Sequence, residues 1–519
     1  MKWIGFAAAG FFAASILPVL ARADVKPAAL FSDHMVLQQG MAVPVWGWAD
    51  PGEQVTVTIG DQKQTATTGD DKKWMVKLTD LKAGDPTEMT IAGKNSITIK
   101  DVLIGEVWVG SGQSNMTFPV SKARGSYAGL INEEQEIAAA NYPQIRMFAP
   151  RSVKSYEPQA DLSGHWEVCS PQTVPGFSAV GYLFARDLQR EIKSPVGIVT
   201  LAFGASTAEA WISREALSAD PALKPTLDGF DASVSFFKTN PTAPASQAPP
   251  IPWPINKAKS TAGRQKDPVQ DQHEPTVLFN GLINPAIPYA IKGVIWYQGE
   301  SIVGGDAGLA RYPLLQATLI QDWRKRWGEG DFPFYIVQLP ALQNISNNPL
   351  VREGQATVLT LPNTAMAVTI DIGDPKDVHP HKKAPLGERL TRIALANAYG
   401  QKIEYSGPIY DSMKVEGSTI RVKFTHVGAG LIARSGPLKW FQIAGDDQKF
   451  VTADAKIDGD SIIVSSPDVK SPVAVRYAFD DYPEGCNLYN CFTPGTEDGF
   501  PAAPFRTDRW AYPVVGIVN

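Results

Sequence analysis

The chain has 519 residues, with 48 basic and 53 acidic side chains and a formal net charge of −5. Apolar residues make up 44% and charged residues 19%, which is typical of a globular protein and, at this length, predicts two or three domains. The mild acidity excludes the basic footprint of a nucleic-acid binder and a long-range attraction to anionic membranes.

The first 23 residues have the pattern of a secretory signal peptide. Lys2 is followed by a small, apolar run to Leu20, and Ala21-Arg22-Ala23 fits the small-x-small cleavage rule. The alternative is a membrane anchor, but the run is rich in Ala and Gly, and no later segment reads as a bilayer span. We therefore expect residues 1–23 to be removed and the mature protein to be exported, periplasmic or secreted, without membrane attachment.

Residues 24–101 have the pattern of a small antiparallel β-sandwich. The run 43–48 precedes the turn Asp50-Pro51-Gly52, and residues 54–59 then alternate apolar and polar side chains. Further short strands are predicted at 74–78 and 96–100.

From residue 102 to 405, buried apolar strands alternate with helices. Strands are predicted at 102–109, 197–202, 293–297 and 334–339, and helices at 179–191 and 312–327. This alternation predicts an α/β domain with a largely parallel sheet covered on both faces. Residues 239–276 are rich in Pro, Ala and Lys and lack periodicity, so we expect a surface insertion there.

The β pattern returns over residues 406–519, which we expect to form a C-terminal β unit. Strands are predicted at 419–424, 461–464 and 473–477. The sequence leaves open whether this unit folds separately or completes the N-terminal one.

Three cysteines, Cys169, Cys486 and Cys491, are too few for a disulfide scaffold, and no CxxC pair indicates a structural metal. In an exported protein we expect a local bridge between Cys486 and Cys491, because the segment between them is short. The alternative is three packed thiols.

A polar cluster follows each strand of the central region, where open α/β sheets bind their ligands. The first, residues 110–116, places Ser114 among glycines. It is a candidate nucleophile whose own backbone N–H helps to bind an oxyanion, and the alternative is a glycine-rich turn. Met116 stands where the GxSxG motif needs its second glycine, which excludes the nucleophile elbow of the α/β-hydrolases.

A serine nucleophile needs a base, and the candidate histidines are His379 and His381, in an acidic loop after the predicted strand at 366–370. A carboxylate beside a histidine orients the imidazole and stabilises its charged form, and Asp377 lies two residues before His379. Two alternatives stay open, namely a metal loop with both histidines as ligands and a polar turn without chemistry.

Two other strand ends carry hydrogen-bond donors. The carboxamide of Gln298 is suited to donate an N–H to a developing oxyanion, although it is also suited to cap the following segment. Residues 203–206 offer unhindered backbone N–H groups.

In this order the clusters resemble the SGNH hydrolase superfamily, specifically its sialate O-acetylesterase-like branch. Residues 112–116 (Gly-Gln-Ser-Asn-Met), 296–301 (Trp-Tyr-Gln-Gly-Glu-Ser) and 377–380 (Asp-Val-His-Pro) resemble three of its sequence blocks. Further signatures lie at 31–38 and 504–508, so the resemblance covers almost the whole mature chain.

The resemblance implies a three-layer, flavodoxin-like α/β/α domain at 102–405, with accessory antiparallel, jelly-roll-like β-sandwich units at both ends. It implies Ser114 as nucleophile and His379 as general base. It also implies an oxyanion hole formed by the N–H groups of Ser114 and Gly204 and by the side chain of Gln298.

Within the matching blocks we expect Asn115 and Glu300 to contact the substrate. The superfamily's usual acid position holds Lys376 here, so Asp377 is the expected orienting acid. The alternatives are Asp374 and a Ser–His dyad without an acid. Two further departures are Ala205, where relatives carry a second glycine, and Ile302, where they often carry Asn.

The implied reaction is the removal of O-acetyl groups from a carbohydrate without a cofactor or a metal. The implied substrates are O-acetyl sialic acid or acetylated plant hemicelluloses such as xyloglucan and xylan. Two alternatives are a secreted carbohydrate-binding protein without activity and a general lipase or thioesterase on the same fold. The oligomeric state is not determined by the sequence.

Overall fold

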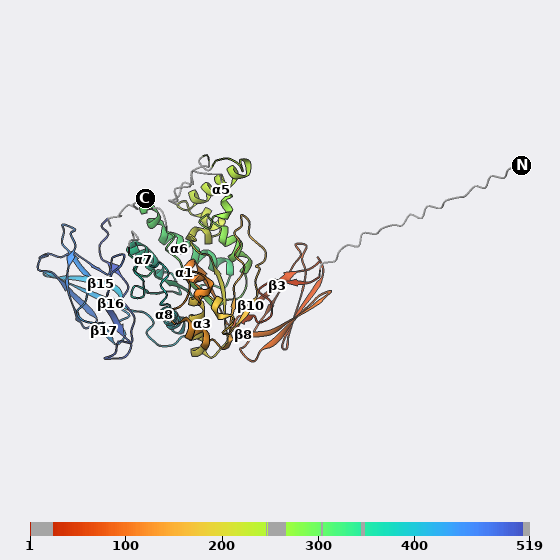
Figure 1. The fold of residues 1–519 in the computed structure, drawn as a ribbon, viewed down its shortest axis with the longest axis horizontal. Helices are drawn as coiled ribbons and strands as arrows, with labels where there is room; N and C mark the ends of the chain where they lie inside the picture. The colour runs from red at the N-terminus through yellow and green to blue at the C-terminus, as the bar shows by residue number, and fades with distance from the viewer. Residues whose placement is uncertain (2–23, 245–246, 248–265, 303–304, 344–347, 512–519) are drawn as a thin grey trace.

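The computed structural model describes residues 24–244, 266–302, 305–343 and 348–511, together with Met1 and Gln247. The predicted signal peptide, apart from Met1, and most of the predicted insertion at 239–276 therefore lie outside the described residues. Within the described ranges, no helix is both long enough and apolar enough to cross a membrane. An α/β region lies between two β regions, one at each end of the molecule (Figure 1).

The central sheet contains a run of seven strands. Their order is β10 (Trp166–Cys169), β9 (Tyr142–Phe148), β11 (Val196–Ala202), β8 (Ser96–Gly112), β12 (Gly293–Tyr297), β13 (Phe334–Val337) and β14 (Thr364–Ala367). All neighbours are parallel except β10 and β9. In the sheet, β8 lies between β11 and β12. The strands that follow β8 in the sequence are therefore added first on one side of it, as β9 to β11, and then on the other side, as β12 to β14. The carboxyl end of β8 is therefore the topological switch point, where such sheets bind ligands.

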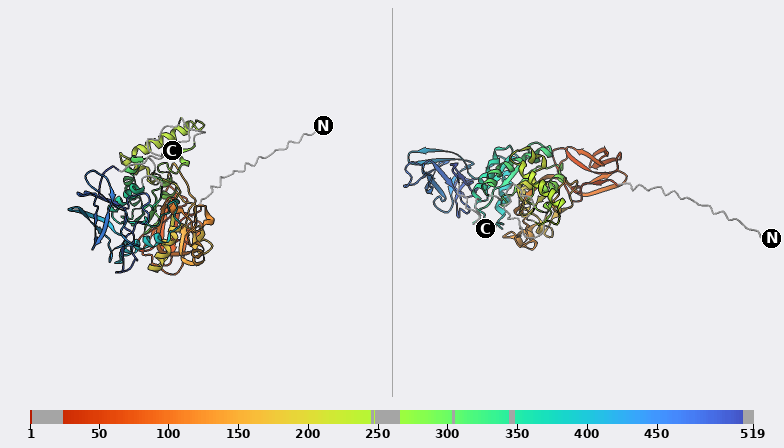
Figure 2. Two further views of the ribbon diagram at one scale, coloured as in Figure 1. Left: turned by 60° about the vertical axis from the view of Figure 1, so that its left-hand side comes forward. Right: turned by 90° about the horizontal axis from the view of Figure 1, so that it is seen from above.

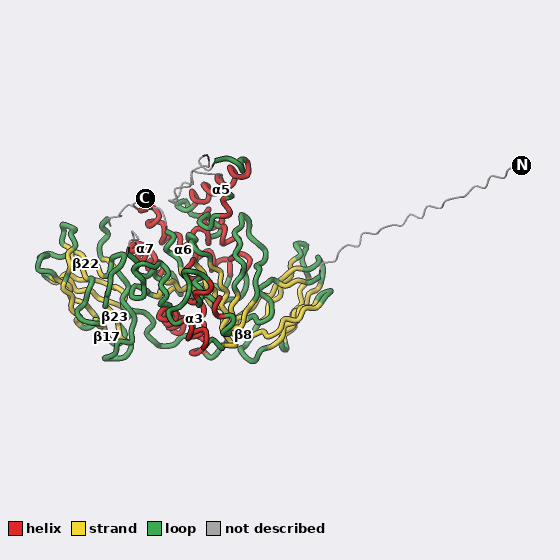
Figure 3. Tube along the Cα trace, viewed as in Figure 1, coloured by secondary structure: helices red, strands yellow, loops and turns green. Residues whose placement is uncertain are grey.

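The helices gather in the central region, as Figure 3 shows. They are α1 (Ser114–Thr117), α2 (Glu133–Ala139), α3 (Ala179–Ile192), α4 (Arg214–Ala219), α5 (Lys224–Thr239), α6 (Gly305–Trp327), α7 (Asn348–Ala356) and α8 (Ala384–Asn397). Helix α3 packs against α8, and α6 packs against α7. The side-chain oxygen of Ser178 caps α3 by accepting the N–H of Gly181, and most of the helix is buried, as expected for a helix that covers a sheet.

The N-terminal β region is joined to the central sheet by one strand. The first half of β8 pairs with β7 (Thr87–Ala92), whereas its second half pairs with β11 and β12. The other strands here are β1 (Lys26–Pro27), β2 (Val36–Gln38), β3 (Val43–Trp48), β4 (Gln54–Ile59), β5 (Gln62–Thr67) and β6 (Lys73–Leu78). The buried apolar side chains of this region and of the central region form one continuous core.

The C-terminal β region has its own apolar core, to which Ala341, Met366, Val368 and Ile370 of the central region contribute. One sheet has the order β15 (Ile409–Glu416), β16 (Thr419–Thr425), β21 (Ser461–Ser465) and β20 (Asp454–Asp458). A second pairs β17 (Gly430–Ala433) with β23 (Leu488–Cys491), and a third has the order β19 (Val451–Thr452), β18 (Phe441–Ala444), β22 (Ala474–Tyr477) and β24 (Phe505–Arg506).

The C-terminal strands do not complete the N-terminal region. Among the described residues, no strand beyond residue 406 pairs with a strand before residue 102. The two β regions lie at opposite ends of the molecule in Figure 1 and in the right-hand view of Figure 2. The question that the sequence left open is therefore answered in favour of two separate β regions.

The expected bridge between Cys486 and Cys491 is wrong, because all three cysteines are buried free thiols. The Cys491 thiol lies at the end of β23 and donates a hydrogen bond to the Gly430 carbonyl at 3.5 Å. The Cys486 thiol instead lies against Tyr477, and burial raises its pKa to about 12. The two side chains thus have different partners, although only four residues separate them.

Candidate active site

Ser114 is the first residue of α1, two residues after the carboxyl end of β8. Gly112, the last residue of β8, has a φ of +129°, and a Cβ there would lie 2.0 Å from the carbonyl oxygen of Tyr297. This close approach to β12 requires glycine. The next residue, Gln113, donates its N–H to the same oxygen at 2.9 Å, and its side-chain oxygen accepts the N–H groups of Gly299 and Ser301. Backbone contacts to β12 and the loop after it therefore fix the position of Ser114.

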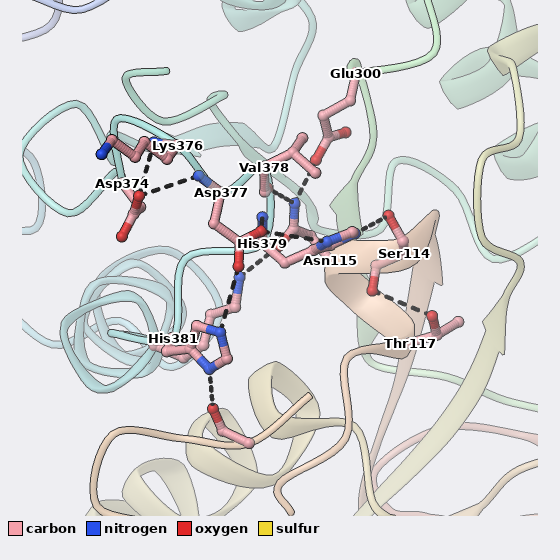
Figure 4. A network of polar contacts seen from close by, with 12 residues as sticks. Ser114, Asn115, Thr117, Glu300, Asp374, Lys376, Asp377, Val378, His379 and His381 are labelled. Carbon is pink, nitrogen blue, oxygen red and sulfur yellow. Dashed lines mark hydrogen bonds and ion pairs between the residues drawn. The ribbon is translucent and has the colours of Figure 1, made fainter. Parts of the chain in front are cut away.

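A hydrogen bond of 2.8 Å joins Ser114 Oγ to His379 Nε2, although 265 residues separate the two in the sequence. Figure 4 shows the two side chains facing each other. The imidazole is 18% exposed, and burial lowers the pKa of His379 below its usual 6.5. The negative charge of Asp377 opposes this shift, whereas Lys383 and His381 add to it. A largely neutral histidine in contact with a serine hydroxyl is suited to accept its proton.

The two candidate acids have different contacts. Asp377 Oδ1 lies 3.7 Å from His379 Nδ1 and accepts the His379 N–H at 2.8 Å, while its Oδ2 lies 3.5 Å from His381 Nε2. Asp374 instead accepts the backbone N–H groups of Lys376 and Asp377 at 2.8 and 3.0 Å. Asp377 thus faces the imidazole, while Asp374 stabilises the turn before it (Figure 4).

His379 and His381 do not face a common point. His379 Nε2 contacts Ser114, whereas His381 Nδ1 lies 2.5 Å from the carbonyl oxygen of Gly129. Within the described ranges, no group of three or more His, Cys, Asp or Glu side chains is placed to hold a metal ion.

The two loops that carry the candidate oxyanion donors Gly204 and Gln298 make different contacts. A Cβ on Gly204 would lie 3.7 Å from that of Ser114, so the loop after β11 passes directly beside the serine. Gln298 is fully buried, and its Nε2 donates to the Ser206 carbonyl at 3.2 Å. Tyr312 donates its O–H to the side-chain oxygen of Gln298 at 3.2 Å. A carboxamide nitrogen has two N–H groups, and the contact with Ser206 uses one of them.

The two residues expected to contact the substrate meet each other. Asn115 is fully buried, and its Nδ2 donates to Glu300 Oε1 at 2.5 Å and to the Val378 carbonyl at 2.9 Å. Glu300 Oε2 is buried and has no hydrogen-bond partner among the described residues. Burial raises the pKa of Glu300. The carboxamide beside the serine therefore contacts the histidine loop directly, and its contact with substrate stays a prediction.

Two residues of the site were missed by sequence reasoning. Lys383 is 1% exposed, and its Nζ donates to Asn115 Oδ1 at 2.5 Å. In the sequence it is the second of two adjacent lysines, and nothing there distinguishes it from Lys382, which is exposed. Tyr127 is 36% exposed and its ring centroid lies 4.9 Å from that of His379. Its sequence position, far from any predicted strand end, gave no signal.

Comparison with known proteins shows similarity along nearly the whole chain. Residues 277–396 match the family described as carbohydrate esterase, sialic acid-specific acetylesterase. The sialate O-acetylesterase of Rattus norvegicus is 29% identical over 538 residues, covering 92% of this chain and 93% of the relative. The Homo sapiens enzyme of the same name is 27% identical, covering 96% of each. The crystal structure of a carbohydrate acetylesterase from Xanthomonas citri is 33% identical, with a TM-score of 0.79, covering 94% of this chain and all of that one.

Proposed function

The chain belongs to the sialate O-acetylesterase-like branch of the SGNH hydrolase superfamily and is a carboxylic ester hydrolase, and from this premise we propose that it deacetylates carbohydrates through a serine acyl-enzyme. The observation that carries the mechanism is the 2.8 Å contact between Ser114 Oγ and His379 Nε2 at the switch point of the sheet.

In the first step, Ser114 Oγ attacks the acetyl carbonyl while His379 accepts the serine proton. The tetrahedral oxyanion is bound by the N–H groups of Ser114 and Gly204 and by the side chain of Gln298. When this intermediate collapses, the ester C–O bond breaks and His379 returns its proton to the departing sugar hydroxyl. In the second step, His379 deprotonates a water that attacks the acetyl-serine. When this second tetrahedral intermediate collapses, the bond to Ser114 Oγ breaks, His379 returns its proton to that oxygen, and acetate leaves.

Asp377 acts on the imidazolium that forms in each step. Its carboxylate lies 3.7 Å from His379 Nδ1, close enough for charge stabilisation and longer than a hydrogen bond. Asp374 acts only on the conformation of the loop. Asn115 and Glu300 complete the site next to the acetyl group, and no step needs a cofactor or a metal.

The proposal extends to architecture and location. The parallel central sheet supports a three-layer, flavodoxin-like α/β/α domain at 102–405. The antiparallel sheets at both ends support accessory β-sandwich units, jelly-roll-like in form, at 24–101 and 406–519. Residues 1–23 act as a signal peptide, so the protein is periplasmic or secreted. N-terminal sequencing of the exported protein tests this, because the mature chain is expected to begin at Asp24.

The substrate is an acetylated sugar, either O-acetyl sialic acid or an acetylated hemicellulose such as xyloglucan or xylan. The test is acetate release from each of these and from a chromogenic acetate, with Ser114→Ala beside the wild type. We expect Ser114→Ala to abolish turnover with folding intact. Ser412→Ala, at an exposed serine of β15, is the matched control and is expected to retain full activity.

Other outcomes contradict the proposal in separate ways. Normal turnover in Ser114→Ala would overturn the assignment of the nucleophile. No release from any substrate would favour the carbohydrate-binding protein, and a rate that rises with acyl chain length would favour a lipase or thioesterase. Gln298→Ala tests the oxyanion hole and is expected to lower the rate by about 10²–10³-fold.

A further inference from the structure

Lys383 is a buried cation that the mechanism above does not use. It immediately precedes α8, and its ammonium lies among the rings of Phe118 and Tyr297, with Nζ 4.9 and 5.2 Å from their centroids. Burying an ammonium costs free energy unless it is paired and hydrogen-bonded. Here the hydrogen bond goes to Asn115 and the compensating charges are those of Glu300 and Asp377.

These contacts form a closed set, which we call the Asn115 cluster: Asn115, Glu300, Val378 and Lys383. The carboxamide of Asn115 uses both of its N–H groups and its oxygen, each toward a different partner. Asn115 directly follows Ser114, and Val378 directly precedes His379. The side-chain amide of Asn115 therefore links the two chain segments that bring Ser114 and His379 together. Lys383 fixes which way this amide is turned, because an ammonium only donates and therefore selects the oxygen.

We propose that Lys383 is a positioning residue of the esterase, which locks the Asn115 carboxamide so that Ser114 and His379 stay in register and which keeps His379 neutral by its charge. This rests on the proposed function. His379 contacts Ser114, Asp377 and the ring of Tyr127, and the charged groups that influence its pKa are Asp377, Lys383 and His381. Of these, Lys383 is the buried cation.

The burial of Lys383 supports its proposed effect on the charge of His379. It lowers the pKa of Lys383 to about 7, so the amine is charged below neutral pH, where His379 titrates. A positive charge nearby disfavours the imidazolium and lowers the pKa of His379. Removing the charge should therefore raise the pKa of His379 and move the acid limb of kcat/KM to higher pH.

The test is Lys383→Met, which keeps an unbranched side chain but removes the donor and the charge. We expect kcat to fall by about 10- to 100-fold, the usual worth of a hydrogen bond to a charged group, with a smaller change in KM. The acid limb should move to higher pH. Lys382→Met, at the exposed neighbouring lysine, is the matched control and should leave both kcat and the pH profile unchanged.

A double-mutant cycle with Asn115→Ala separates positioning from packing. If Lys383 acts on kcat through Asn115, the double variant should lose no more kcat than Asn115→Ala alone. The shift of the acid limb should appear in Lys383→Met and not in Asn115→Ala, which retains the lysine. Additive losses of kcat, or an unmoved acid limb in Lys383→Met, would overturn the inference.

Should Lys383→Met alone fail to fold, Lys383→Met/Glu300→Gln removes the charges of both partners, and the new amide still offers an oxygen to Asn115. Wild-type kcat and pH profile in this folded double variant would also overturn the inference. Ser114→Ala in the same series distinguishes failure of the proposed serine mechanism from failure of the proposed role of Lys383. If it abolishes activity while the lysine variants resemble wild type, only the role of Lys383 fails.

Discussion

The two segments that meet at the site, the serine turn (residues 110–117) and the histidine loop (residues 371–383), are held in different ways. The serine turn ends a buried strand, and backbone contacts to the neighbouring strand fix it. The histidine loop is held mainly by side chains, namely Asp374 on its own backbone, Asn115 on Val378 and His381 on Gly129. Its backbone also accepts two longer hydrogen bonds, from the N–H groups of Gln343 and Ile131 at 3.2 and 3.4 Å. The position of Ser114 is thus set by the sheet, whereas that of His379 is set by a few polar contacts. Changes to the backbone contacts of the serine turn should therefore act on the fold, and changes to the side-chain contacts of the histidine loop should act on the chemistry.

The largest effect is expected at Gly112. In Gly112→Ala the new Cβ would lie 2.0 Å from the Tyr297 carbonyl oxygen, a backbone atom that cannot move without separating β8 from β12. We expect a loss of about 4 kcal/mol or more in the free energy of unfolding, together with loss of activity. Thermal and denaturant unfolding measure it. Gly110→Ala is the control, because its Cβ would meet the flexible Met116 sulfur at 3.3 Å. Equal effects at both glycines would contradict the comparison.

In the histidine loop, Asp377→Asn should leave stability nearly unchanged and lower kcat by about 10-fold, which corresponds to roughly one pKa unit of lost charge stabilisation. Wild-type kcat/KM should have its acid limb below pH 6.5, because burial lowers the pKa of His379 and a base works only when deprotonated. Asp377 raises that pKa, so its removal should move the limb to still lower pH. Asp374→Asn keeps the acceptor oxygen and should leave the limb in place. A larger shift in Asp374→Asn than in Asp377→Asn would reverse the assignment of the acid.

A smaller effect is expected at Tyr127, whose ring packs on the imidazole with centroids 4.9 Å apart. Tyr127→Ala admits water to His379, so the pKa of His379 should rise toward 6.5. We expect kcat to fall about 3-fold, which corresponds to the loss of one aromatic contact. The pH profile of kcat/KM measures this. Tyr127→Phe retains the ring and should behave as wild type. A similar loss in both variants would assign the effect to the hydroxyl instead.

The smallest effect concerns the third loop of the site, after β11, where the backbone rather than a side chain is strained. Ala205 has a φ of +55°, in the left-handed region that costs a residue with a Cβ about 1 kcal/mol. Ala205→Gly should relieve this cost, less the extra entropy of glycine in the unfolded chain, for a net gain of about 0.5 kcal/mol. Thermal unfolding measures it, and a loss of stability would show that the methyl group makes a contact worth more than the strain.

Much of the central fold was predictable because buried parallel strands read as short apolar runs. The strand predicted at 293–297 matches β12, and the helix predicted at 179–191 matches α3 within one residue. The strands at 96–100 and 102–109 were predicted separately, however, and are one strand, β8. Asp101, between the two predicted strands, has a φ of +54°, but β8 continues through it.

The proximity of Ser114 and His379 was predictable from the sequence, whereas the contacts that support the two residues were less so. Ser114 and His379 follow strand ends, and topology brings strand ends together. Whether the side chain of Asn115 contacts substrate or protein depends on its hydrogen bonds to Glu300 and Lys383. These two residues lie about 190 and 270 positions further along the chain. Local pattern carries no such information. The same limit explains the bridge wrongly expected between Cys486 and Cys491, whose spacing permitted a contact that their tertiary partners exclude.

The continuity of β8 has a consequence for how such proteins can be inherited and recombined. A crossover between genes near residue 101 would cut a strand that pairs with β7 in the N-terminal region and with β11 and β12 in the central region, and the two regions share one core. Exchange of the N-terminal region should therefore be rare and costly. The C-terminal region has its own core, so a crossover near residue 406 cuts no strand. Variation among descendants in the number and kind of appended sheets is expected at that end of the chain.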